Sequence, residues 1–60
     1  MRFTKIVKTN CENAKIKLEV INRALSNSSM TADEIKNTIE KIIELIDTNI
    51  EFLDREISEQ

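Results

Sequence analysis

Near its middle the chain reads Ser26-Asn27-Ser28-Ser29-Met30-Thr31-Ala32-Asp33-Glu34, a polar stretch between two long helical patterns. Thr31 and Glu34 have the spacing of a capping box, in which each side chain accepts a hydrogen bond from the other residue's backbone N–H. Met30 and Ile35 stand at the positions of a hydrophobic staple, and Asp33 suits the positive end of a helix dipole. The stretch therefore predicts a loop followed by a helix that begins at about residue 32.

On both sides of this loop, apolar residues recur every three or four positions, which is typical of amphipathic helices. The first stripe is Phe3, Val7, Cys11, Ala14, Leu18, Ile21 and Leu25; the second is Ile35, Ile39, Ile42, Ile46, Ile50, Leu53 and Ile57, widened by Ile43. The pattern predicts one all-α domain, an antiparallel two-helix hairpin, with helices at about 3–26 and 32–58 and a loop at about 27–31. A second capping-box pattern at Thr9–Glu12 leaves an alternative in which residues 2–8 are extended.

A loop this short makes the two helices antiparallel neighbours. Residues whose numbers add to about 57 are then expected to face each other. Small Cys11 and Ala14 would lie opposite Ile46 and Ile43, with the Cys11 thiol buried as packing. The same arrangement brings a basic cluster beside an acidic one, so that each neutralises the other: Arg2, Lys5 and Lys8 beside Glu51, Asp54, Glu56 and Glu59.

The chain has 60 residues, no Gly, Pro or His, and one Cys. A core of this size is marginal without a disulfide, a metal or oligomerisation. One Cys cannot form a disulfide within the chain, and the chain has no Cys/His cluster for a metal. We therefore expect self-association, most simply a homodimer that forms a four-helix bundle like that of the plasmid regulator Rop. That likeness is of helix pattern and transfers no function.

Some apolar residues fall off the two stripes on a helical wheel, namely Ile16 and Val20 in the first half and Leu45 and Phe52 in the second. The hypothesis is that these four form the surface that binds a partner. A strip of acids, Glu40, Glu44, Asp47, Glu51 and Asp54, is a secondary candidate, although such a strip is more often a solvated face. Asn10, Asn22 and Asn49 border the stripes, either as plain boundary residues or as determinants of register and oligomer number.

Without His, and with Cys11 on a stripe, the sequence offers no nucleophile pair, metal site or cofactor site, so we expect no enzyme. The prediction is a small cytoplasmic protein-binding regulator, an inhibitor or adaptor of phage or bacterial origin, with no membrane attachment. One alternative is a nucleic-acid-binding regulator that uses the basic first helix in a Rop-like dimer. Another is a structural assembly subunit.

Overall fold

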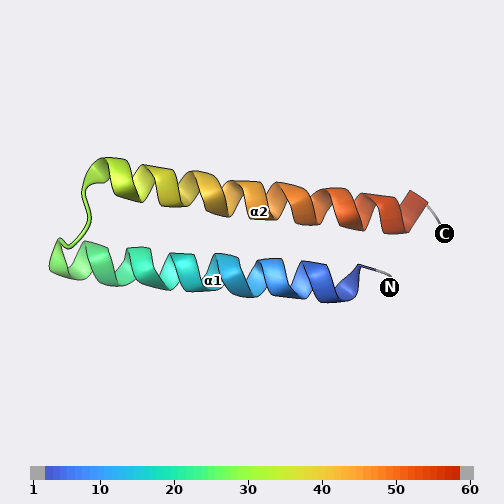
Figure 1. Ribbon diagram of the computed structural model, residues 1–60, viewed down its shortest axis with the longest axis horizontal. Helices are drawn as coiled ribbons and strands as arrows, with labels where there is room; N and C mark the ends of the chain where they lie inside the picture. Colours follow the sequence, from blue (N-terminus) through green and yellow to red (C-terminus); the bar gives the residue numbers. More distant parts are fainter. Residues whose placement is uncertain (1–2, 59–60) are drawn as a thin grey trace.

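The computed structural model describes residues 3–58, which form two antiparallel helices side by side (Figure 1). Helix α1 is Thr4–Asn27 and helix α2 is Ala32–Ser58. The prediction of an all-α hairpin is confirmed, and α1 runs unbroken through Thr9–Glu12, so the alternative of an extended segment is wrong for residues 4–8. Arg2 and Glu59, which the sequence placed in the charged clusters, lie outside the described residues.

The turn between the helices is made without glycine. Ser28 adopts the left-handed conformation at φ 55° and ψ 35°, and its backbone N–H donates to the Ala24 carbonyl oxygen. The next N–H, of Ser29, donates both to the same carbonyl at 3.2 Å and to the Asn27 side-chain oxygen at 3.1 Å. These bonds satisfy the C-terminal end of α1 and turn the chain back toward α2.

The capping box at the start of α2 is present. The Thr31 backbone N–H donates to Glu34 Oε1 at 3.0 Å, and the Glu34 N–H donates to Thr31 Oγ1 at 3.2 Å. Hydrogen bonding from Thr31, mainly from its backbone N–H and then from its side chain, holds the pKa of the Glu34 carboxyl below its ordinary value. Met30 and Ile35, the predicted staple pair, are both half-buried.

This capping box predicts an acid-sensitive contribution to stability. Because folding lowers the pKa of Glu34, the ionised carboxylate stabilises the fold fully above the unfolded pKa of about 4.5. This stabilisation is lost as the pH falls through the lower pKa of the folded state. We expect acidification from pH 7 to pH 3 to weaken the wild type more than a Glu34→Gln variant, whose amide accepts the same bond at every pH. Urea unfolding at both pH values measures this; equal losses in the two proteins would contradict it.

The seam between the helices is rotated from the predicted stripes. The residues turned toward the partner helix are Phe3, Val7, Asn10, Ala14, Lys17, Ile21 and Ala24 on α1, and Ile35, Thr38, Ile42, Leu45, Asn49, Phe52 and Glu56 on α2. Leu18 and Leu25 of the first stripe and most isoleucines of the second are exposed instead. The Cα trace is 47 × 17 × 10 Å, one helix thick, so a single seam is all that the hairpin can enclose.

Polar contacts explain why the seam takes this face. Asn49 is 6% exposed, and its amide nitrogen donates to the Val7 carbonyl oxygen and to Cys11 Sγ, both at 3.3 Å, while its oxygen accepts from the Asn10 amide at 2.9 Å. Small Ala14 and Ala24 are buried in the same seam and allow the backbones to approach. The longitudinal register is near the predicted one, because Asn10 meets Asn49, but Cys11 is exposed and the prediction that it is buried was wrong.

The open end of the hairpin is closed by a second set of contacts. Glu56 is 8% exposed, and its Oε1 accepts the backbone N–H of Phe3, the N-cap residue of α1, at 2.8 Å. The Phe3 and Phe52 rings pack with centroids 4.8 Å apart, and the Arg55 guanidinium carbon lies 5.9 Å from the centroid of the Phe52 ring. A carboxylate of α2 thus caps the positive end of α1.

The asparagine pair carries a testable energy. We expect Asn49→Leu to lower the free energy of unfolding by about 1–3 kcal/mol, because it leaves the half-buried Asn10 amide without its acceptor. The double variant Asn10→Leu/Asn49→Leu removes both partners and should recover most of the loss. Chemical denaturation of the wild type, both single variants and the double variant gives the coupling energy. A double variant whose loss is the sum of the two single losses would show that the pair is not coupled.

Candidate protein-binding surfaces

A broad apolar face lies on one side of the seam. When two antiparallel helices are viewed from one end, residue numbers increase clockwise around one helix and anticlockwise around the other. A step of four residues from a seam residue therefore leads to the same side of the hairpin in both helices. Four residues after the seam residues Val7, Ala14 and Ile21 come Cys11, Leu18 and Leu25, and four after Ile35, Ile42 and Asn49 come Ile39, Ile46 and Leu53. Ile43, Ile50 and Ile57 flank the α2 row, and we call these nine residues the isoleucine face.

Every member of the isoleucine face is exposed in the hairpin. Neighbouring residues show the division most clearly, since Ile42 is 5% exposed and Ile43 is 51% exposed. Within residues 3–58 the buried apolar side chains are four: Ala14, Ile21, Ala24 and Ile42. More large aliphatic side chains therefore lie on this outer face than in the seam.

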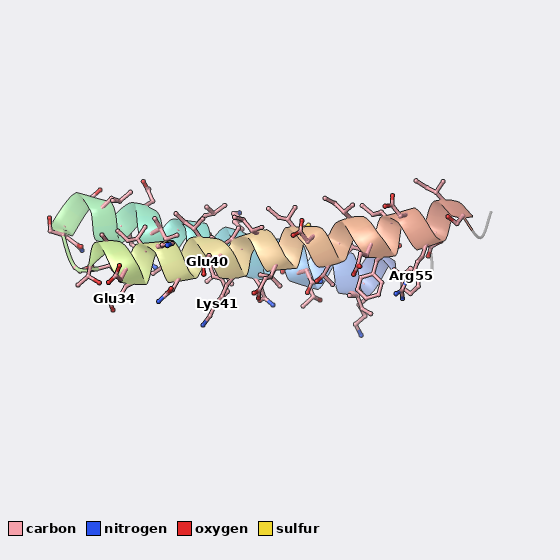
Figure 2. The ribbon with its side chains drawn as sticks, turned by 90° about the horizontal axis from the view of Figure 1, so that it is seen from above. Glu34, Glu40, Lys41 and Arg55 are labelled. Carbon is pink, nitrogen blue, oxygen red and sulfur yellow. The ribbon has the colours of Figure 1, made fainter. Side chains whose placement is uncertain are left out.

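The opposite side of the seam holds a groove of about 540 Å³. We call it the lysine groove; its lining residues are Asn13, Ile16, Lys17, Lys41, Glu44, Leu45 and Thr48. Ile16 and Leu45, two of the predicted contact residues, both line it, and Val20 is exposed one turn further along α1. Figure 2 shows Glu34, Lys41 and Arg55 following this one side of α2.

The structure corrects the placement of two predicted contact residues. Leu45 and Phe52 were expected outside the hairpin, but Leu45 packs against the buried cluster of Ala14, Ile21 and Ile42, and Phe52 packs on Phe3. Both are half-buried seam residues, and Leu45 also lines the lysine groove. On a helical wheel these two residues fall outside the row of isoleucines, and that row is mostly exposed and is not the seam of the hairpin.

The acidic strip occupies the side of α2 that faces away from α1. Its five members, Glu40, Glu44, Asp47, Glu51 and Asp54, are all exposed. By heptad position, Glu44 and Glu51 lie nearer the lysine groove, and Glu40, Asp47 and Asp54 lie nearer the isoleucine face. The strip therefore does not pair with α1 of its own hairpin, contrary to the expectation that Glu51 and Asp54 lie beside Lys5 and Lys8.

The basic residues of α1 are spread around the helix. Lys8 and Lys15 border the isoleucine face, Lys17 lines the lysine groove, and Lys5 and Arg23 lie on the outside. They make no single basic surface for a phosphate backbone. Among residues 3–58, no group of three His, Cys, Asp or Glu side chains is arranged to hold a metal ion.

Neither α1 nor α2, as described, combines the length and apolar character needed to cross a membrane. Comparison with protein-family models, with curated proteins and with solved structures found no match.

Proposed function

We propose that the protein is a non-catalytic, protein-binding regulator that acts as a homo-oligomeric helical bundle. The observation that carries this proposal is the isoleucine face, a continuous row of aliphatic side chains at heptad spacing on an amphipathic hairpin. Contiguous apolar surfaces of this kind mark sites of protein association. A second copy of the chain is always available to cover this face, because it is present at the protein's own concentration.

The exposed area supports self-association. The chain exposes 4767 Å², whereas a folded monomer of its mass, 7.0 kDa, exposes about 4,000 Å². The excess of about 700 Å² is close to the roughly 800 Å² that each partner buries in a standard stable interface. Packing two isoleucine faces together gives a four-helix bundle, in which each helix contributes one face to its hairpin and another to its partner copy.

The lysine groove is the surface that remains for a regulatory partner. Its apolar lining residues are Ile16 and Leu45, and Lys17 and Lys41 outnumber the single acid, Glu44. A groove of this composition fits an amphipathic helix that carries acidic side chains beside its apolar stripe. The nucleic-acid alternative has less support, because the lysines and arginine of α1 do not share a face.

Two measurements test this function. Sedimentation equilibrium over a range of concentrations should give a closed dimer; a monomer at all concentrations would overturn the proposal, and open-ended growth would favour the structural-subunit alternative. Fluorescence anisotropy with a labelled acidic amphipathic peptide should show binding that Lys41→Glu removes and Lys41→Arg keeps. Salt-dependent binding to RNA or DNA in place of the peptide would favour the nucleic-acid alternative.

A further inference from the structure

The isoleucine face can pair with a second copy in two ways, and the charges distinguish them. If the two-fold axis is parallel to the helices, α1 packs on the partner's α2 and both loops lie at the same end. If the axis is perpendicular to the helices within the interface, α1 packs on the partner's α1, α2 packs on the partner's α2, and the loops lie at opposite ends. All neighbouring helices are antiparallel in both arrangements, so helix direction alone does not decide.

The two helices carry opposite net charge. Helix α1 has five basic and two acidic side chains, a net of +3, and α2 has three basic and eight acidic side chains, a net of −5. The same-end arrangement therefore brings unlike helices together across the interface. The opposite-end arrangement brings each helix against its own copy, so that the two acidic α2 helices are neighbours.

The side chains at the edge of the isoleucine face sharpen this contrast. In the hairpin, Phe3 is level with Glu56 and Asn10 with Asn49, and an axis parallel to the helices preserves these levels between copies. Lys15 of one copy then lies level with the turn of the partner's α2 between Glu40 and Asp47, and Lys8 lies one heptad further on, between Asp47 and Asp54. Lys8 and Lys15 share the seven-residue repeat of Glu40, Asp47 and Asp54, so the two lysines interdigitate with the three acids along this part of the edge.

The opposite-end arrangement has no such match. It sets Glu40, Asp47 and Asp54 beside the same residues of the second copy, with Lys36 as the basic side chain on that edge. Glu12 and Glu19 of α1 lie further round the helix than Lys8 and Lys15, so they weaken the attraction in the same-end arrangement without reversing it. Surface charges of this kind select orientation more than they add affinity.

We propose that a second copy of the chain covers the isoleucine face with both loops at the same end, each basic α1 lying against the partner's acidic α2. This inference rests on the proposed self-association and adds the arrangement. It assigns a partner to the outer half of the acidic strip: Glu40, Asp47 and Asp54 face the lysines of the second copy.

Distance measurements between the two loops test the arrangement. A spin label is placed at Ser29→Cys in a Cys11→Ser background, where serine keeps an acceptor for the Asn49 amide. Same-end loops should give a single distance of about 10–25 Å, since neighbouring axes in a bundle are 8–10 Å apart. Loops at opposite ends are separated by the helix length, about 40 Å. A long or a mixed distribution in a dimer overturns the arrangement and leaves self-association standing; a monomeric mass overturns both.

A charge reversal provides an independent readout in unlabelled protein. At low salt, Asp47→Lys should raise the dimer dissociation constant about fivefold to tenfold, because it sets a lysine between Lys8 and Lys15 of the partner. Adding Lys15→Glu to that variant should restore part of the affinity. The matched control is Glu51→Lys, on the lysine-groove side of α2, which should change the constant less. In the opposite-end arrangement, Asp47→Lys would relieve repulsion between acids of the two copies and tighten the dimer. Tighter association would therefore overturn the same-end arrangement.

Discussion

Replacing Ile46 with glutamate is expected to convert the oligomer into a monomer. Ile46 lies in the middle of the isoleucine face and is 48% exposed in the hairpin, so a glutamate there is accommodated by an isolated chain. In the bundle the carboxylate would be buried without a partner, which costs several kcal/mol. Because a two-fold interface carries each substitution twice, the dissociation constant should rise at least about a hundredfold.

Sedimentation equilibrium at several protein concentrations measures this change. The matched control is Ile16→Glu, because Ile16 is 57% exposed, is the same residue type and lies in the lysine groove on the other side of the seam. It should keep the mass of the wild type. If Ile46→Glu stays oligomeric, or if Ile16→Glu alone dissociates the protein, the isoleucine face is not the contact between copies.

Much of the fold is predictable from the sequence because its signals are local. The capping box of Thr31 and Glu34 depends on residues three apart, and the loop is the one polar stretch without helical periodicity. Antiparallel packing then follows from the short loop. Even the longitudinal register, approximated from the loop, is close to that shown by the contact of Asn10 with Asn49.

The faces of the helices were harder to predict, for a physical reason. A wide apolar stripe can contain one seam or the halves of two, and spacing alone does not separate them. On α2 the row of isoleucines belongs mostly to the outer face. The hairpin seam contains two polar residues, Asn49 and Glu56, and the aromatic residue Phe52. These polar side chains are buried because specific partners across the seam, the Asn10 amide and the Phe3 N–H, satisfy them. Such pairings depend on residues about 40 or 50 positions apart, and no local pattern encodes them.

The placement of the candidate contact residues agrees with the sequence in part. Ile16 and Val20 are exposed off the seam as expected, whereas Leu45 and Phe52 help to hold the hairpin closed. Substituting Phe52 would therefore disturb the fold before it disturbed a partner. A signal for the isoleucine face was nevertheless present: seven isoleucines on one 27-residue helix exceed what one neighbouring helix can cover.

Ile42 and Ile43, adjacent in the chain, are expected to respond to truncation for different reasons. Ile42→Ala should lower the free energy of unfolding by about 2–5 kcal/mol per chain, because Ile42 is one of the two large aliphatic side chains buried in the seam and the cavity left behind cannot collapse between two helices. Ile42→Val should cost about 0.5–1.5 kcal/mol. Urea unfolding, at one fixed protein concentration and with Ile16→Ala as the exposed control, measures both. A loss below about 1 kcal/mol for Ile42→Ala would contradict its place in the seam.

Ile43→Ala reports on whether the outer face is covered. In a hairpin that stands alone, Ile43 is half in water, and its truncation should change the free energy of unfolding by no more than about 0.5 kcal/mol, as for Ile16→Ala. If a second copy packs on the isoleucine face, the same methyl groups are lost from an interface, and the cost should clearly exceed that of Ile16→Ala. The extra cost of Ile43→Ala should also disappear in a chain that already carries Ile46→Glu, because both substitutions remove the same contact between copies. Additive losses in the double variant would place Ile43 in contact with its own chain and not with a second one.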